Sequence, residues 1–241
     1  MSGHSKWSTI KRQKGATDQK RGQAFTKLSN AITLAVRQGG GIVDPSQNFK
    51  LRLSVDAARA LNMPKENIER AIKRALGKEA GDLQEAVYEG FAPEGVSVII
   101  EAATDNPART TAQIKSIFNK AGGNFGQPGS VAYQFNQIGE IIVKKNGKTL
   151  DDAFALAAES GADDVEELDD EYNIYTSVIN FAKVREDLEK AGLEIVDSSI
   201  ARQPVAFISV SQEKSDKVIS FLEQIEELDD VQKIYSNLEI N

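Results

Sequence analysis

The chain has 241 residues, a net charge of −7 and no cysteine. That length is enough for two or three domains, and the lack of cysteine excludes disulfides, cysteine nucleophiles and zinc–thiolate sites. The longest apolar run, Val96 to Ile100, is far shorter than the roughly 20 residues of a membrane span, so we expect a cytoplasmic protein without a membrane partner.

Positive charge is concentrated at the N-terminal end. Residues 2–37 contain eight Lys or Arg and one Asp, a net charge of +7, whereas residues 81–241 carry −17. A cationic head on an anionic body is typical of a protein that binds a polyanion. Residues 2–16 have only Trp7 and Ile10 as large apolar side chains, so we predict a free tail that contacts phosphates and stacks Trp7 on an unpaired base. The alternative is that Trp7 and Ile10 fold back onto the first helix and the lysines are merely solvated.

Three helices are expected over residues 1–80. Apolar residues at three- and four-residue steps predict a first helix from Thr17 or Asp18 to the glycines at 39–41. Asp44-Pro45 predicts the start of a second helix that ends near Leu61, and Pro64 opens a third that ends at Gly77. None of these helices buries its apolar stripe alone, so a small bundle is expected. Six basic residues extend its positive surface: Arg52, Arg59, Lys65, Arg70, Lys73 and Arg74.

The rest of the chain is predicted to form two α+β domains. Residues 89–135 predict strand, strand, helix and strand, the last strand covering Val131 to Phe135. Residues 138–203 follow the order β-α-β-β-α-β, which is the ferredoxin-like plan. Residues 205–240 predict strand, helix and strand, which we expect to complete the sheet begun before residue 137. The expected domains are therefore 1–80, a discontinuous α+β domain of 81–137 with 204–241, and an inserted ferredoxin-like domain of 138–203.

Several long motifs make the whole chain resemble the YebC family. They are GHSKW from Gly3, IKRQKG from Ile10, DQKRGQAFTK from Asp18, MPKENIERAI from Met63, TDN from Thr104, RT from Arg109 and GGNFGQPGSVAY from Gly122. The resemblance implies a three-domain cytoplasmic protein with a helical N-terminal domain and two α+β domains. It also implies a DNA-binding transcriptional regulator, with the alternative of a ribosome-associated translation factor that binds ribosomal RNA and relieves stalling.

Nucleic-acid contacts carried over by these motifs fall mainly in the head. The residues are His4, Lys6, Trp7, Lys11, Arg12, Lys14, Lys20, Arg21 and Lys27, with Arg109 as a weaker addition. The family pattern usually has a basic residue where Pro107 stands and often glycine where Ala92 stands, which weakens any contact assigned to the middle domain. The expected partner is DNA or ribosomal RNA, with the ribosome as a further possibility.

The remaining motifs give no support for a catalytic, metal-binding or cofactor-binding site. His4 is the single histidine, which excludes a histidine metal cluster, and in the basic tail we expect it to contact a phosphate or a base. Gly147-Lys148-Thr149 has Ile142 where a P-loop needs its first glycine, and Gly126 to Gly129 precedes a strand where a KH domain would need a helix. The acidic run 163–171 lacks EF-hand spacing and is expected to be a solvated edge. We therefore expect a protein that is not an enzyme, with no cofactor, metal or small-molecule substrate.

Overall fold

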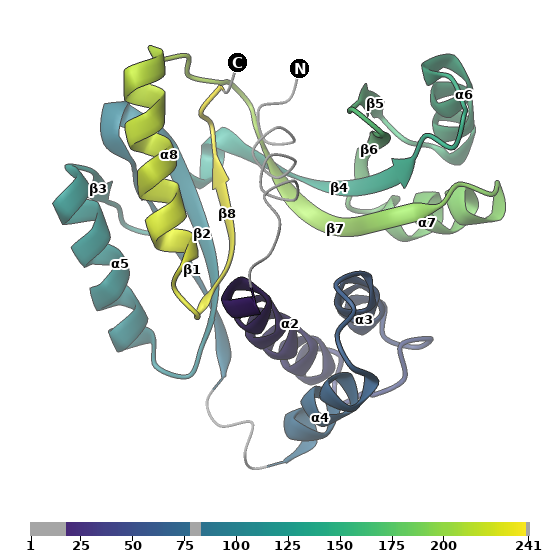
Figure 1. Ribbon diagram of the computed structural model, residues 1–241, viewed down its shortest axis with the longest axis horizontal. Coiled ribbons are helices and arrows are strands. Elements are labelled where there is room, and N and C mark those ends of the chain that lie inside the picture. Colours follow the sequence, from purple (N-terminus) through teal and green to yellow (C-terminus); the bar gives the residue numbers. More distant parts are fainter. Residues whose placement is uncertain (1–17, 78–82, 240–241) are drawn as a thin grey trace.

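The computed structural model describes residues 18–77 and 83–239, which form a helical bundle and two four-stranded antiparallel sheets (Figure 1). The head residues 1–17 lie outside this range, and with them the predicted tail and Trp7. No helix in the described ranges combines the length and apolarity needed to cross a membrane.

The bundle contains α2 (Asp18–Gln38), α3 (Phe49–Ala60) and α4 (Lys65–Leu76), packed around Ile32, Val36, Leu51, Val55, Ile68 and Ala71. The start of α4 after Pro64 agrees with the sequence. The predicted start of α3 at Asp44-Pro45 is wrong by about one turn, because Asn48 is the N-cap and accepts the backbone N–H of Leu51 at 3.1 Å. Asp44 instead accepts the N–H of Ser46 in the preceding turn.

The first sheet has the strand order β3-β1-β2-β8. Its elements are β1 (Gln84–Phe91), the 3₁₀ turn η2 (Pro93–Gly95), β2 (Ser97–Thr104), α5 (Pro107–Ala121), β3 (Asn124–Phe125), α8 (Gln212–Glu226) and β8 (Val231–Ser236). Helices α5 and α8 cover one face, and Phe118 and Phe221 meet edge to face at a centroid distance of 4.8 Å. Strand β8 pairs with β2, so the C-terminal segment completes the sheet begun by β1 and β2 (Figure 1).

The second sheet has the strand order β5-β6-β4-β7 and is ferredoxin-like. Its elements are β4 (Phe135–Lys144), α6 (Leu150–Ser160), β5 (Asp164–Glu167), β6 (Glu171–Ser177), α7 (Phe181–Lys190) and β7 (Ile195–Pro204). Ile141, Ile174, Val184 and Leu188 are fully buried between this sheet and α6 and α7. The predicted fold class, a helical region followed by two α+β units with one inserted in the other, is thus confirmed.

Two predicted strands are not formed. In place of the strand expected at Val131 to Phe135, Ala132–Gln134 form the 3₁₀ turn η3, because Glu89 accepts hydrogen bonds from the backbone N–H groups of Gly129, Val131 and Ala132 at 2.7, 2.8 and 2.8 Å. These N–H groups point at a carboxylate, so β4 begins only at Phe135. The strand expected from Val205 is reduced to a single parallel bridge between Ile208 and Leu238.

The two sheets meet through their helix-free faces. Ile99 and Tyr235 of the first sheet pack with Phe135 and Ala201 of the second, and Arg202 donates to Glu101 at 2.8 Å. Burial, with the nearby Glu101 carboxylate, raises the pKa of Tyr235 well above its usual value. The bundle touches both sheets, since α2 contacts β2 and β8 while α3 contacts β7. The bundle therefore braces the junction between the two α+β units.

Candidate nucleic-acid interface

Most of the predicted contact residues lie outside the described ranges. These are His4, Lys6, Trp7, Lys11, Arg12 and Lys14. Lys20 lies in the first turn of α2, and Arg21 is exposed one residue later. Lys27 and Arg109 are described in full, and both make close contacts within the protein.

Lys27 joins α2 to the end of α8. Its Nζ donates to the backbone carbonyl of Glu226 at 2.6 Å, and Gln23 donates to the carbonyl of Glu227 at 3.4 Å. The last carbonyls of a helix have no intrahelical partner and carry partial negative charge, so a lysine ammonium stabilises them. The half-buried Lys27 therefore has a structural role that the sequence did not reveal.

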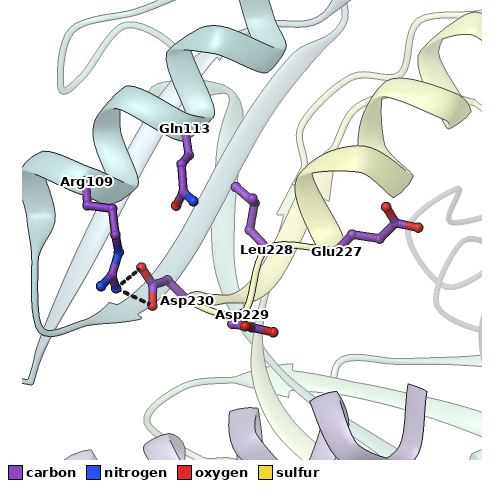
Figure 2. Close-up of a pocket in the computed structure, with 6 residues that line it drawn as sticks. All are labelled: Arg109, Gln113, Glu227, Leu228, Asp229 and Asp230. Carbon is purple, nitrogen blue, oxygen red and sulfur yellow. Dashed lines mark hydrogen bonds and ion pairs between the residues drawn. The ribbon is translucent and has the colours of Figure 1, made fainter. Parts of the chain in front are cut away.

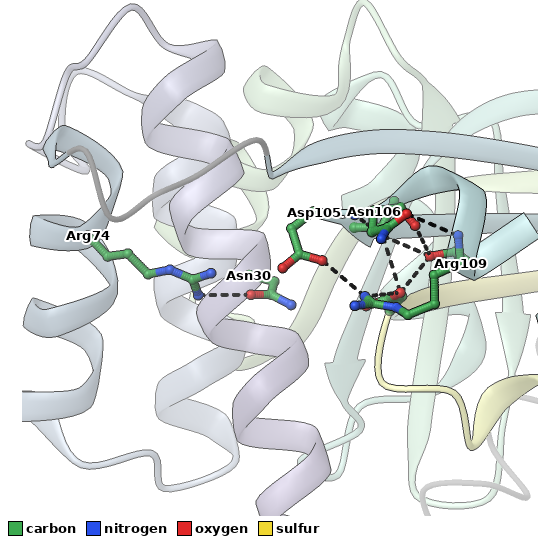
Figure 3. A network of polar contacts seen from close by, with 8 residues as sticks. Asn30, Arg74, Asp105, Asn106 and Arg109 are labelled. Atoms are coloured by element: carbon green, nitrogen blue, oxygen red, sulfur yellow. Dashed lines mark hydrogen bonds and ion pairs between the residues drawn. The ribbon is translucent and has the colours of Figure 1, made fainter.

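Arg109 belongs to a polar network at the start of α5. Asn106 is the N-cap of α5 and accepts the Arg109 N–H at 3.1 Å, which places Arg109 in the first turn of the helix. The guanidinium donates to Asp230 at 2.8 Å and to Asp105 at 3.0 Å (Figure 2 shows the Asp230 contact, Figure 3 the one with Asp105). Its side chain remains 46% exposed. Two carboxylates thus compensate the charge that would attract a phosphate.

Asp230 is the centre of this network. Besides Arg109, its Oδ2 accepts the hydroxyl of Thr110 at 2.5 Å and that of Thr104 at 3.2 Å. Burial alone would raise the pKa of Asp230, but the hydrogen bonds from Arg109 and Thr110 outweigh it and lower that pKa. Nothing in the sequence distinguished Asp230 from its acidic neighbours, because its partners come from β2 and α5.

A pocket of about 290 Å³ opens beside this network (Figure 2). Its lining residues are Arg109, Gln113, Glu227, Leu228, Asp229 and Asp230. Three carboxylates and one guanidinium give the lining a net negative charge, which disfavours a phosphate or another anion. The pocket is therefore no candidate for the nucleic-acid contact.

Three arginines of the bundle are held by neutral oxygen atoms. Arg74 of α4 donates to the side-chain oxygen of Asn30 on α2 at 3.1 Å (Figure 3). Arg70 donates to Asn67 at 3.0 Å, and Arg52 donates to the carbonyls of Pro45 and Ser46, both at 3.1 Å. Within the described ranges none of the three pairs with a carboxylate. They are oriented by hydrogen bonds without losing their net charge.

On α4 the basic side chains form a stripe. Arg70, Lys73 and Arg74 are spaced three and four residues apart and so share one face of the helix. Arg70 and Lys73 are exposed, and Arg74 is half-buried against α2. We call these three residues the α4 basic stripe. The other two predicted basic residues of the bundle differ, since Arg59 pairs with Asp56 at 3.6 Å and Lys65 with Glu69 at 3.7 Å.

No three His, Cys, Asp or Glu side chains in residues 18–77 and 83–239 are grouped so that they would hold a metal ion. The acidic run 163–171 forms β5, a turn and the start of β6. Lys145 lies against it and pairs with Glu167 at 2.8 Å. The run is thus an edge of the second sheet, as the sequence suggested.

Comparisons with known proteins cover almost the whole chain. Residues 5–78 match the model of the TACO1/YebC protein N-terminal domain, and residues 83–238 match that of the TACO1/YebC second and third domain. A probable transcriptional regulatory protein of Roseiflexus castenholzii is 47% identical over 100% of this chain and 96% of its own length. One of the same name from Persephonella marina is 45% identical over 100% of this chain and 97% of its own.

The fold is also found in a solved structure. The crystal structure of a conserved hypothetical protein, Aq1575 from Aquifex aeolicus, superposes with a TM-score of 0.89. The two chains are 39% identical, and the match covers 98% of this chain and 97% of the other. The arrangement of bundle and sheets described above is therefore shared with an experimentally determined structure.

Proposed function

This chain belongs to the TACO1/YebC family, and from that premise we propose that it is a nucleic-acid-binding regulatory protein without catalytic activity, acting in the cytoplasm. The regulatory names of its relatives support the class, and DNA is the partner that those names favour. The proposed contact surface combines the predicted head residues with Arg52 of α3 and the α4 basic stripe, and Arg109 is a weaker contact.

The observation that carries this proposal is the charge left uncompensated on Arg52, Arg70 and Arg74. An arginine paired with a carboxylate gains little from a phosphate, because the carboxylate repels the incoming anion. An arginine oriented by neutral oxygens keeps its full charge for a phosphate, and its position is already fixed. With the +7 head, these residues give the N-terminal part of the chain its positive field.

We propose the domain division given by the sequence: 1–80, 81–137 with 204–241, and 138–203. Two separate sheets support it, since each has its own helices and its own buried core. The positive head and bundle would then approach the polyanion while the two acidic units stay at a distance.

Salt dependence of binding tests the proposal. Anisotropy of a labelled DNA duplex should give a log-log slope of roughly −4 to −5 against salt concentration if about five phosphates are neutralised. Replacing Arg70→Gln and Lys73→Gln together should make the slope less steep by about 1.8. Lys183→Gln with Lys190→Gln removes the same charge from α7, where both lysines pair with carboxylates, and should leave the slope unchanged. A wild-type slope near zero would contradict nucleic-acid binding.

A parallel titration with a structured fragment of ribosomal RNA separates the two candidate partners. Tighter binding to the RNA than to the duplex at equal salt concentration would favour the translation factor over the transcriptional regulator. Co-sedimentation with ribosomes that survives DNase treatment and is lost when Lys11, Arg12 and Lys14 become Glu would point to the same conclusion.

A further inference from the structure

Residues 106–139 are the longest stretch of the two acidic units that lacks a negative charge. They contain Arg109, Lys115 and Lys120 and no Asp or Glu, whereas residues 81–241 as a whole carry −17. The stretch forms α5, β3, η3 and the start of β4. A polyanion that the rest of these units repels therefore meets no carboxylate from this part of the chain.

The exposed face of α5 consists of basic, small and neutral polar side chains. Its residues are Ala108, Arg109, Ala112, Gln113, Lys115, Ser116, Asn119 and Lys120. None of the large apolar side chains that are exposed in the described ranges lies on α5. A protein partner usually needs an apolar or aromatic anchor in such a face, whereas a phosphate needs only positive charge and hydrogen-bond donors. The composition of this face therefore favours a nucleic-acid backbone over a protein.

Lys115 and Lys120 keep their charge. Within residues 18–77 and 83–239 neither lysine forms an ion pair with a carboxylate. The Lys115 ammonium lies 5.1 Å from the centroid of the Phe125 ring on β3, a contact that orients the side chain without neutralising it. Arg109 in the first turn differs, because Asp230 and Asp105 compensate its charge. The available positive charge of α5 thus lies in its second half, away from the acidic pocket.

The spacing of the two lysines fits a phosphate backbone. They are five residues apart, which corresponds to about 7.5 Å along the helix axis. Asn119 follows Lys115 by four residues and Ser116 precedes Lys120 by four, so both lie between the lysines on the exposed face. We call these four residues the α5 contact face. Each strand of a DNA duplex offers a phosphate about every 3.4 Å along its axis, so one strand can contact both lysines.

The end of α5 is closed in a way that does not oppose an anion. The Gly122 N–H donates to the carbonyl of Asn119 at 3.4 Å, and the Gly123 N–H donates to that of Phe118 at 2.9 Å. The last carbonyls of a helix carry partial negative charge and would repel a phosphate beside Lys120. Because Gly122 adopts the left-handed conformation, two of these carbonyls are satisfied within the chain.

We propose that the α5 contact face is a second phosphate-binding surface for the nucleic acid that the bundle binds. Figure 3 shows Asn30 of α2 between Arg74 of α4 and Arg109 at the start of α5, and α5 runs from there along the first sheet (Figure 1). A duplex bound to the α4 basic stripe would then extend over α5. This inference rests on the proposed function and makes one face of the first acidic unit the exception to its distance from the polyanion.

The salt dependence of DNA binding tests the two lysines. In the full-length protein, Lys115→Gln with Lys120→Gln should make the log-log slope of affinity against salt concentration less steep by about 1.8, because two phosphates lose their partners. Lys214→Gln with Lys217→Gln is the matched control. It removes the same charge from α8, which packs beside α5, but these lysines pair with Glu94 and Glu213 and their loss should leave the slope unchanged.

A single cysteine locates the duplex on the protein. The chain has no cysteine, so Ser116→Cys provides one attachment point for a photoactivated crosslinker on the α5 contact face. The labelled protein should crosslink to a DNA duplex, and the yield should fall when Lys115→Gln and Lys120→Gln are added. Ala182→Cys places the same label at an exposed position on α7 and should give no crosslink above that of a sample kept in the dark.

The possible outcomes separate this inference from the proposed function. An unchanged slope for the Lys115, Lys120 variant, with no crosslink from Ser116→Cys, would overturn the α5 contact. If the Arg70, Lys73 variant still had a less steep slope, the proposed function would stand. A less steep slope for the Lys115, Lys120 variant alone would support the α5 contact and contradict the α4 basic stripe. A wild-type slope near zero would contradict both proposals.

A protein partner for α5 is the remaining outcome. If the labelled Ser116→Cys protein crosslinks in a cell extract to protein and not to nucleic acid, the α5 contact face serves another macromolecule and the inference is overturned. Crosslinks to nucleic acid that are lost on nuclease treatment would support it.

Discussion

Arg185 on α7 and Asp56 on α3 form an ion pair of 2.7 Å that joins the ferredoxin-like unit to the helical bundle. Arg185 is 8% exposed, and its Nε also donates to the Ser198 hydroxyl at 3.0 Å. Next to this pair, the rings of Phe49 and Phe181 meet edge to face with centroids 5.5 Å apart. A charged and an aromatic contact thus hold the same two elements together.

Removing the carboxylate of this pair should destabilise the protein. Asp56→Ala leaves the Arg185 guanidinium buried with one weaker charged partner, Glu189 at 3.6 Å. We expect a loss of about 1 to 2 kcal/mol in the free energy of unfolding, less than for a fully buried pair because Asp56 is partly exposed. Urea denaturation measures the loss. As a control, Asp187→Ala breaks the surface pair with Lys183 and should lower the free energy of unfolding by at most about 0.5 kcal/mol. Equal losses for Asp56→Ala and Asp187→Ala would show that the interface pair stabilises the protein no more than a surface pair.

Glu89 should make stability depend on pH. Burial would raise the pKa of Glu89, but the N–H groups of Gly129, Val131 and Ala132 lower it below its usual value. A lowered pKa in the folded state means that the stabilisation is present above the unfolded-state pKa, near 4.3, and is lost as pH falls through the folded-state pKa. Glu89→Gln should therefore cost about 1.5 to 3 kcal/mol at pH 7.

Thermal or urea unfolding from pH 7 down to about pH 3 measures this difference, which should shrink below the unfolded-state pKa. Glu85→Gln changes an exposed carboxylate on the same strand and is the matched control. A difference between wild type and Glu89→Gln that stays constant over the whole range would mean that the carboxylate charge does not hold the 129–132 loop.

Gly139 is required by the close approach of Phe181. A Cβ atom at position 139 would lie 2.5 Å from the Phe181 ring, so Gly139→Ala should destabilise the protein by about 1 to 3 kcal/mol. Phe181→Leu in the same chain should recover part of the loss by making room. Gly22→Ala is the contrasting change, because nothing lies within 4 Å of a Cβ atom at position 22. Alanine favours the helix over glycine, so this change should raise the free energy of unfolding by up to about 1 kcal/mol.

Asp230 should matter more for folding than for binding. Asp230→Asn removes the charge that holds Arg109, Thr110 and Thr104, and we expect a loss of about 1.5 to 3 kcal/mol at neutral pH. The log-log slope of DNA affinity against salt concentration should stay as steep as in wild type or become steeper, because Arg109 is released from the Asp230 carboxylate. Arg109→Gln should change the slope by less than one, in contrast to the Arg70, Lys73 variant. A larger change for Arg109→Gln would make Arg109 a principal contact.

Local patterns in the sequence predicted much of the fold. Pro64 acts at the start of α4, and the helix expected within residues 205–240 is formed as α8, which buries Val218, Phe221, Leu222 and Ile225. The errors arose where a distant side chain determines the backbone. Asn48 caps α3 while its amide binds the carbonyl of Ala35, and Glu89 captures the loop that looked like a strand. No local pattern reports such contacts.

The candidate site was less accessible to sequence reasoning. Charge counting located the basic head and bundle, but it treated every lysine and arginine alike. The structure separates Lys27, which binds the end of α8, from Arg70 and Arg74, which neutral oxygens orient.

The pairing of β8 with β2 sets an order for assembly during synthesis. A ribosome delivers the chain from its N-terminus at roughly 10 residues per second, so the whole of the second sheet is made a few seconds before β8 emerges. Until then β2 has an open edge, and the hydrophobic face meant for α8 is bare. The inserted unit is thus complete before the unit that hosts it.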